Sequence, residues 1–291
     1  MLPPISLKLP MMLLAESGAT KTEWQLGSPG NLIKAWRGEG LNPNALNEET
    51  LRIRLDQQLQ SIPNLDEVSH VQFYGAGLGR PGRVEQMKHY LLGYFPSATL
   101  SIQDDLKASL DCQGVDTGIV MIVGTGSNVA RFEEGQRVAQ AGGLGYLLGD
   151  EGSGVDLGRS LLRALLMPGW PQDLKEYFFR AIGLPPQTII SALYDSQPPT
   201  AFLSRLAPLL SAAIDHPKVQ TLVQQRFSTL VESALLPLLT TKTLPILATG
   251  SVAYHFEGQL RSVLTAQDLN LAGVIPDPVQ ALGQRFFGLL E

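Results

Sequence analysis

The sequence has few of the residues that build covalent cross-links or metal sites. It contains one cysteine, Cys112, and four histidines, His70, His89, His216 and His255. A single cysteine excludes a disulfide within the chain and any metal site that needs several thiolates from one chain. No two histidines are four residues apart, so the sequence does not favour a zinc enzyme. We expect the histidines to have packing or surface roles.

Concentrated basic charge and long apolar runs are also absent. Twenty-two Lys and Arg against 27 Asp and Glu give a net charge of -5. We expect no nucleic-acid partner, because such proteins usually carry a concentrated basic surface. No run of about 18 apolar residues occurs, so no membrane span is expected. The apolar start lacks a basic leader region and runs into a glycine motif. It therefore predicts a short leader before a strand, in a cytoplasmic protein.

The 291 residues include 29 glycines, and these gather behind short apolar runs. Strands that end in glycine loops are typical of α/β proteins. Units of strand, glycine turn and strand open near residues 12–36 and again near 118–141. This pattern predicts two similar lobes, residues 1–110 and 111–291. The second lobe would carry a helical insertion at about 172–240. A last helix, with Asp277 as N-cap and Pro278 at its first position, could pack back on the first lobe.

Apolar runs and periodicity also predict individual elements. An N-cap at Asn47 is expected to start a helix that ends near Leu59. The other expected helices cover residues 83–94, 106–111, 155–167 and 252–264. The expected strands cover residues 11–15, 23–26, 32–36, 68–74, 99–102, 118–123, 129–132, 244–248 and 269–274.

Two loops combine glycine with hydroxyl side chains: SGATKT at 17–22 and GTGSN at 124–128. Backbone N–H groups can converge on a phosphate where no side chain blocks its approach. Either loop alone could equally be a tight β-hairpin turn. One such loop in each predicted lobe favours the binding of a nucleotide phosphate chain. Neither loop is a Walker P-loop, and GAGLGRPG at 75–82 lacks the spacing of a Rossmann fingerprint.

Two acidic pairs follow predicted strands or glycine turns. The Asp104–Asp105 pair could supply a base that accepts a proton from an attacking hydroxyl, as a sugar kinase needs. It could equally supply the N-cap of the helix that follows. Asp150 and Glu151 lie within GYLLGDEGSG, where flanking glycines suggest close packing around a ligand. In that segment Asp150 or Ser153 could instead cap a helix.

Together these stretches resemble the N-acetylglucosamine kinase family, within the BadF/BadG/BcrA/BcrD-type ATPases of the actin-like, sugar kinase and Hsp70 superfamily. The resemblance covers about residues 12–256, and GDEGSG is its most specific motif. It implies two ribonuclease-H-like lobes around a central nucleotide cleft. The stretches that carry it are LLAESGATKTEW, GEGLNPNAL, VQFYGAGLG, QDDLKASL, IVGTGSNVA, GGLGYLLGDEGSGVDLGR and ATGSVAYHF.

The resemblance implies a role for each motif residue, with ATP and Mg²⁺ as cofactors. Asp105 matches the catalytic base, and Glu16 matches the acid that helps hold Mg²⁺ through water. The ATP phosphates would lie against Ser17, Gly18, Ala19, Thr20, Lys21, Thr22, Gly124, Thr125 and Gly126. Gly250 and Ser251 would face the adenosine. The sugar would contact Asn42, Ser127, Asn128, Gly143 and Asp150.

Four positions depart from the family pattern, and one of them is Asp104, where many relatives carry Asn. Glu16 stands where relatives usually have Asp. Its side chain is one methylene longer, which could weaken activity or alter the metal geometry. Misplacing a catalytic group by about 1 Å can cost ~100-fold in rate. Leu144 and Tyr146 stand where relatives often have Trp and His. This difference leaves the identity of the sugar substrate undecided.

The leading hypothesis is an ATP-dependent kinase that makes N-acetylglucosamine 6-phosphate. The same chemistry on glucosamine or N-acetylmuramic acid is the nearest alternative. A non-catalytic sugar or nucleotide sensor on the same fold is a second class, and another kind of ATPase a third. An iron–sulfur activating ATPase is disfavoured, because one cysteine per chain cannot supply four ligands from a dimer. The resemblance also allows a homodimer, for which residues 172–240 could supply the interface.

Overall fold

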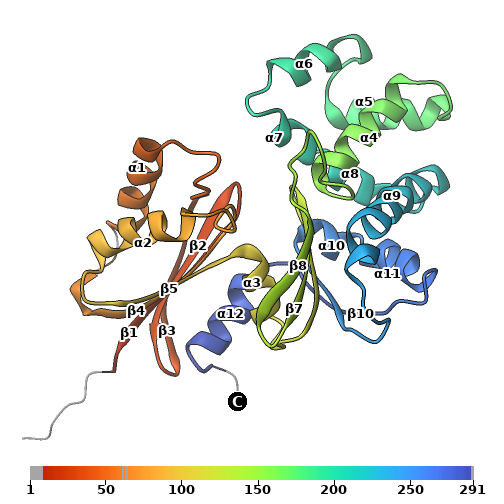
Figure 1. Cartoon of the computed structure of the whole chain (residues 1–291). Helices are drawn as coiled ribbons and strands as arrows, with labels where there is room; N and C mark the ends of the chain where they lie inside the picture. The colour runs from red at the N-terminus through yellow and green to blue at the C-terminus, as the bar shows by residue number, and fades with distance from the viewer. Residues whose placement is uncertain (1–8, 61, 63–64, 290–291) are drawn as a thin grey trace, which may run out of the picture. The chain divides into compact units, whose positions relative to one another are not determined.

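The computed structural model describes residues 9–60, 62 and 65–289 (Figure 1). Most of the predicted leader therefore lies outside the described residues. The chain divides into two compact units. Unit 1 runs up to Cys112 and takes in the C-terminal segment from Pro278, and unit 2 runs from Gln113 to Asp277. The C-terminal helix packs against strands β1 and β2 and helix α3 of unit 1.

Unit 1 is built on a five-stranded sheet in the order β3-β2-β1-β4-β5. The first three strands are antiparallel neighbours, whereas β4 and β5 run parallel to β1. This mixed order follows from the two tight turns early in the chain and the helical crossovers after them. The strands are β1 (Met11–Ser17), β2 (Lys21–Ser28), β3 (Asn31–Glu39), β4 (Val68–Gly75) and β5 (Thr99–Asp104).

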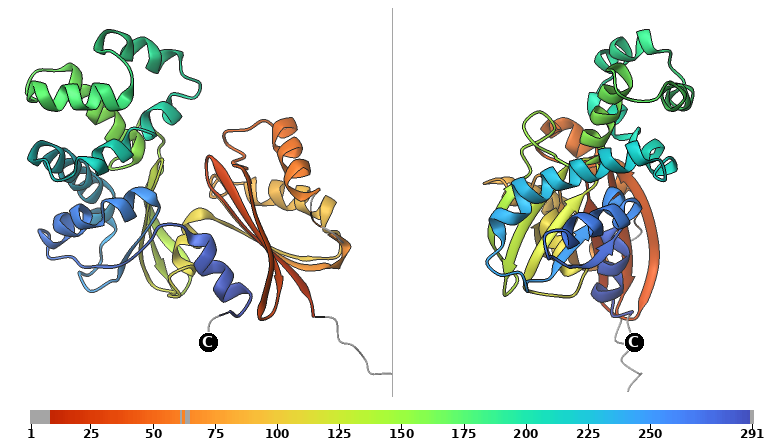
Figure 2. Two further views of the ribbon diagram at one scale, coloured as in Figure 1. Left: turned by 180° about the vertical axis from the view of Figure 1, so that it is seen from behind. Right: turned by 90° about the vertical axis from the view of Figure 1, so that its right-hand side faces the viewer.

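Helices cover both faces of this sheet. Leu13 and Ala15 of β1 share a buried core with α1 and α2, and alternate residues of a strand point to opposite faces. Figure 2 shows α12 on the other side of the sheet from α1 and α2. Asn47 caps α1 as predicted, because its side chain accepts a hydrogen bond from the Thr50 N–H at 2.8 Å. The helices are α1 (Glu48–Leu59), η1 (Leu65–Glu67), α2 (Arg83–Tyr94), α3 (Asp105–Asp111) and α12 (Pro278–Phe286).

Unit 2 repeats the same sheet order. Read from the edge that corresponds to β3, its strands follow the order β8-β7-β6-β9-β10. Strands β6, β7 and β8 are antiparallel neighbours, and β9 and β10 run parallel to β6. The two α/β lobes that the sequence predicts are confirmed, and each has the strand order of a ribonuclease-H-like sheet. The strands are β6 (Gly118–Val123), β7 (Ser127–Glu133), β8 (Gln136–Gly142), β9 (Ile246–Thr249) and β10 (Leu271–Ile275).

A large helical region packs on one face of the second sheet around a single apolar core. The expected single helix over 252–264 is wrong: it is two helices that meet at Phe256. Nowhere in the described part of the chain is a helix long and apolar enough to cross a bilayer. The helices are α4 (Gly154–Leu166), α5 (Gln172–Ile182), η2 (Pro186–Thr188), α6 (Ile189–Asp195), α7 (Pro199–Ser204), α8 (Ala207–Ala212), α9 (Pro217–Leu230), η3 (Val231–Leu235), η4 (Leu236–Leu238), α10 (Ser251–His255) and α11 (Glu257–Thr265).

Candidate active site

In unit 1 the predicted site residues gather at one edge of the sheet. The parallel strands β1, β4 and β5 all end there. Ser17 is in register with Gly75, and Gly75 is in register with Asp104. The SGATKT turn follows β1, and Asp105 follows β5. The edge where parallel strands end is where α/β sheets usually bind ligands.

The SGATKT turn is held from inside by two buried hydroxyls. Ser17 Oγ lies 2.8 Å from Thr22 Oγ1 and accepts a hydrogen bond from the Leu41 N–H at 2.9 Å. Thr22 Oγ1 in turn donates to the Glu39 carbonyl at 2.9 Å. Both hydroxyls are fully buried, so they tie the turn to the end of β3 and to Leu41 just after it.

The tip of this turn is open to solvent. The Gly18 N–H donates to the Lys21 carbonyl at 2.9 Å, which closes the turn and leaves Ala19 and Thr20 exposed. Gly40 packs against the tip, and a Cβ there would lie 2.6 Å from the Ala19 carbonyl oxygen. The Lys21 ammonium lies 3.1 Å from Glu23 Oε1. Backbone N–H groups at the tip are therefore better placed for a phosphate than the buried hydroxyls.

The acidic pair at the end of β5 has the expected cap role in one of its two members. Asp104 caps α3, since its Oδ1 accepts a hydrogen bond from the Lys107 N–H at 3.0 Å. Asp105 is the first residue of α3 and is half-buried. Its Oδ1 accepts from the Leu106 N–H at 3.1 Å. The cap and the candidate base are thus different carboxylates, one residue apart.

Asn42 is fixed in a loop beside the same sheet edge. Its Oδ1 accepts a hydrogen bond from the Asn44 N–H at 2.9 Å, and Asn44 Nδ2 donates to the Gly77 carbonyl at 3.0 Å. Gly77 has φ +82°, and a Cβ there would lie 2.3 Å from Asn42 Oδ1. Only glycine fits this close approach, which explains why GLNPN and GAGLG fold against each other.

Glu16 lies near the end of β1 with 8% of its surface exposed. It is in register with Tyr74 of β4, whose hydroxyl donates to Asp111 Oδ2 at 2.8 Å. Burial, with Asp111 and Glu16 nearby, raises the pKa of the Cys112 thiol to about 12. Among the described residues no three His, Cys, Asp or Glu side chains could jointly hold a metal ion. A single carboxylate fits a metal held mainly through water and substrate oxygens.

In unit 2 the GTGSN turn docks on the N-terminus of α4. The N–H groups of Gly154 and Val155 donate to the carbonyls of Gly124 and Thr125, at 2.8 and 3.2 Å. Ser153 caps α4, because its side chain accepts a hydrogen bond from the Asp156 N–H at 3.2 Å. Of the two residues that the sequence offers as this cap, Ser153 has the role.

Asp150 is bound to the same turn. Its Oδ1 accepts a hydrogen bond from the Ser127 N–H at 3.2 Å, while Ser127 Oγ donates to the Glu151 carbonyl at 2.8 Å. Burial raises the pKa of the Asp150 carboxyl, and the Ser127 N–H partly opposes this shift. Asp150 has φ 62°, a left-handed conformation in which Asp is one of the better-tolerated residues.

The predicted sugar residues of unit 2 therefore form one cluster. The Gly143 N–H donates to the Ser127 carbonyl at 3.2 Å. A Cβ on Gly143 would lie 2.9 Å from Asn128 Nδ2, so these two residues touch. Residues 127, 128, 143 and 150 come together from three separate segments. Their contacts with a sugar stay a prediction, as do those of Asn42 in unit 1.

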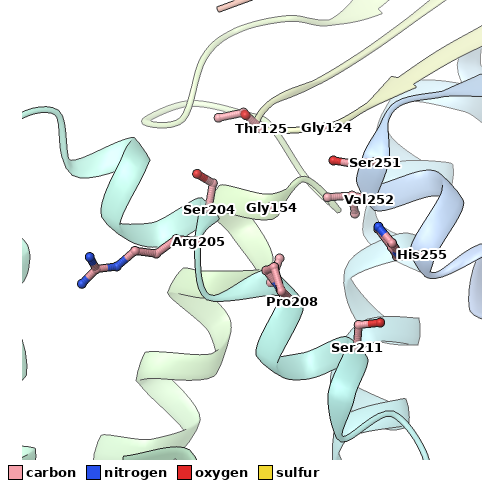
Figure 3. Close-up of a pocket in the computed structure, with 11 residues that line it drawn as sticks. Gly124, Thr125, Gly154, Ser204, Arg205, Pro208, Ser211, Ser251, Val252 and His255 are labelled. Carbon is pink, nitrogen blue, oxygen red and sulfur yellow. The ribbon is translucent and has the colours of Figure 1, made fainter. Parts of the chain in front are cut away.

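A pocket of about 370 Å³ opens beside the GTGSN turn. Figure 3 shows Pro208 and Ser211 of α8 facing Val252 and His255 of α10, while the Arg205 side chain points away from them. Its lining residues are Gly124, Thr125, Gly154, Ser204, Arg205, Ala207, Pro208, Ser211, Ser251, Val252 and His255. The structure thus brings predicted phosphate residues and the predicted adenosine residue Ser251 to one pocket.

Gly250 precedes this pocket at the turn from β9 into α10. Its φ is +108°, and a Cβ there would lie 2.5 Å from the Val123 carbonyl oxygen. Sequence reasoning missed the wall from α7 and α8, because no motif marks it. His255 was expected to have a packing or surface role, and it is an exposed residue of the pocket wall.

Comparisons with known proteins find sugar kinases, in agreement with the family that the sequence motifs resemble. No family model matches the chain. It is 28% identical over 162 residues to the N-acetylmuramic acid/N-acetylglucosamine kinase of Clostridium acetobutylicum, a match that covers 52% of each protein. The match thus spans about half the length of this curated relative.

Two solved structures cover nearly the whole chain. A protein of Porphyromonas gingivalis provisionally assigned as an N-acetylglucosamine kinase has 31% identity and a TM-score of 0.89, over 95% of this chain and 99% of that one. A protein of Chromobacterium violaceum with the same provisional assignment has 20% identity and a TM-score of 0.74, over 97% and 99% of the two chains. The second likeness shows the fold alone.

Proposed function

Because the chain belongs to the N-acetylglucosamine kinase family, we propose that it transfers the γ-phosphoryl group of ATP to an amino sugar. N-acetylglucosamine is the first candidate substrate, and its 6-phosphate the product. The observation that carries this proposal is that the N-cap of α3 is Asp104 and not the neighbouring Asp105. Asp104 caps the helix, so Asp105 need not do so.

Asp105 is the proposed base. The 6-hydroxyl oxygen of the sugar attacks the γ-phosphorus, the bond to the β–γ bridging oxygen breaks, and ADP leaves. The hydroxyl proton passes to the Asp105 carboxylate. A positioned base of this kind contributes about 10²–10⁴-fold to a rate.

The pocket of unit 2 is the proposed adenosine site. Ala207, Pro208 and Val252 supply apolar contacts, while Ser211, Ser251 and His255 supply polar groups. Gly124 and Thr125 line this pocket, and the turn at 124–126 is proposed to bind phosphate. The backbone N–H groups of the exposed residues Ala19 and Thr20 are proposed to do the same in unit 1.

Mg²⁺ would neutralise charge that develops on the transferred phosphoryl group. Glu16 is the proposed residue that holds it, through water. The cluster around Asp150 is the proposed sugar site in unit 2, where a carboxylate and an amide can accept and donate hydrogen bonds to hydroxyls. ATP as co-substrate fits the expected cytoplasmic location. The expected homodimer stays a prediction, which light scattering would test.

A coupled assay of ADP release tests the proposal against a panel of sugars. The panel contains N-acetylglucosamine, glucosamine, N-acetylmuramic acid, N-acetylmannosamine and glucose, each with Mg-ATP. Turnover that depends on an amino sugar supports the kinase. Silence across the panel favours the sensor, which would still be stabilised by its ligand, by ~2.7 kcal/mol at a hundred times Kd.

A further inference from the structure

Two side chains of α4, Asp156 and Arg159, make hydrogen bonds to the backbone on either side of Asp150. Asp156 has 1% of its surface exposed. Its Oδ2 accepts a hydrogen bond from the Gly152 N–H at 2.9 Å, and its Oδ1 accepts from Arg159 Nη2 at 2.8 Å. Nη1 of Arg226, on α9, lies 3.9 Å from Asp156 Oδ1 and adds a second, more distant positive charge. The carboxylate is therefore fully buried and has partners on both oxygens.

Arg159 also reaches the loop on the other side of Asp150. Its Nη1 donates to the Tyr146 carbonyl at 3.1 Å. Asp156 thus fixes the chain two residues after Asp150, and Arg159 fixes it four residues before. The Arg159–Asp156 anchor, as we name this pair with its two backbone contacts, joins both flanks of Asp150 to one helix.

The backbone between these flanks needs such support. Asp150 and Gly152 have φ 62° and 71°. A non-glycine residue in this region persists where the surrounding structure holds it there, and such conformations gather at ligand sites. Because the Arg159 side chain is 49% exposed, solvent screens its ion pair with Asp156, and the pair contributes little to the stability of the whole fold. Local positioning is therefore the better explanation of the anchor.

We propose that Arg159 and Asp156 are positioning residues for the sugar: they hold Asp150 and the 143–149 loop in the geometry that binds the substrate hydroxyls. This inference rests on the proposed function, because it takes the Asp150 cluster as the sugar site. It predicts an effect on the KM for the sugar that is larger than the effect on the KM for ATP. A merely structural role would move both constants, or only the melting temperature.

The test compares Arg159→Ala, Arg159→Lys and Arg163→Ala in the full chain. Arg163 lies one turn further along α4 and is exposed, and its side chain has no hydrogen bond or ion pair to the described residues. Because misplacements near 1 Å can cost about 100-fold, we expect Arg159→Ala to raise the sugar KM about ten-fold or more. The KM for ATP should stay within about two-fold. Lys can donate to one of the two acceptors, so Arg159→Lys should restore part of the loss.

Hydrogen exchange gives a readout that does not depend on turnover. In Arg159→Ala, amides of the 143–152 segment should exchange faster, while those of β6 and β7 should not. Arg163→Ala should match the wild type in both experiments. The inference is overturned if Arg159→Ala leaves the sugar KM unchanged, or if both KM values rise equally. A wild-type chain that turns over no sugar would instead refute the proposed function.

Discussion

The Ser127 N–H donates to Oδ1 of Asp150 at 3.2 Å, across 23 residues of sequence. This bond joins the turn after β6 to the segment before α4. It leaves a partly buried carboxylate beside Gly126 and Ser127, at the proposed sugar site. The same burial that shapes the site makes the charged form of Asp150 costly.

Asp150→Asn should therefore stabilise the protein without ligand at neutral pH. Burial raises the pKa of Asp150 in the folded state above its ordinary 3.8. The folded state thus keeps this proton to higher pH than the unfolded state does, and stability is lost as pH rises from about 4 toward neutrality. Asn keeps an acceptor for the Ser127 N–H and tolerates a positive φ.

Thermal unfolding of both proteins between pH 4 and 7 measures this effect. The advantage of Asp150→Asn should be near zero at the acid end and grow with pH. We expect a higher melting temperature for Asp150→Asn than for the wild type at pH 7, since the direction of the pKa shift sets the sign of the difference. The explanation fails if the variant is less stable than the wild type throughout that range.

Substitutions of Asp104 and Asp105 should have different effects, the first mainly on stability and the second mainly on kcat. Asp105→Asn should lower kcat by about 10²–10⁴-fold, the contribution of a positioned general base, and leave the melting temperature nearly unchanged. Asp104→Ala should cost about 1 kcal/mol of stability, because it removes the cap of α3, and lower kcat much less. Steady-state kinetics and thermal unfolding of the two variants check this. Equal kinetic losses would contradict the assignment of the base.

Thr22→Val should destabilise the fold more than Thr22→Ser. The Thr22 hydroxyl bridges Ser17 and the Glu39 carbonyl inside the protein. Its loss leaves the buried Ser17 hydroxyl without this partner, which costs about 1–3 kcal/mol. Serine keeps the hydroxyl and serves as the matched control. Urea unfolding measures both, and equal stabilities for the two variants would show that the hydroxyl bridge contributes nothing.

Ser211→Phe should weaken ATP binding selectively. Ser211 lines the pocket of unit 2 opposite α10, so a phenyl ring there takes up space proposed for adenosine. Overfilling a packed site costs about 1–3 kcal/mol, and we expect the KM for ATP to rise about ten-fold or more. The sugar KM should change little. Ser191→Phe, on the exposed surface of α6, is the control, and a similar effect of both would argue against the adenosine site.

Local sequence signals predicted most of the fold. The helix expected over residues 83–94 is α2, and the strand expected over 118–123 is β6, with both bounds correct. Asn47 and Pro278 mark helix starts as expected, since caps are local features. β8 was not expected as a strand of its own. Its sequence, QRVAQAG, is largely exposed at a sheet edge and therefore carries little apolar alternation.

Tertiary contacts decide what the motifs could not show. Nothing in SGATKT indicates that Ser17 and Thr22 turn inward, because their partners Glu39 and Leu41 lie 17 and 24 residues away. The pocket wall from α7 and α8 likewise has no local signature. Sequence motifs found the loops, whereas the direction of each side chain required the packed structure.

The most direct test of the central claim is to identify the product of wild-type protein with Mg-ATP and N-acetylglucosamine. Phosphorus NMR, with a parallel assay for ADP, would follow both products of one reaction. The proposed function predicts one equivalent of ADP for each sugar 6-phosphate formed, and no ADP without sugar. ADP release that ignores the sugar, or no release with any amino sugar, would contradict it.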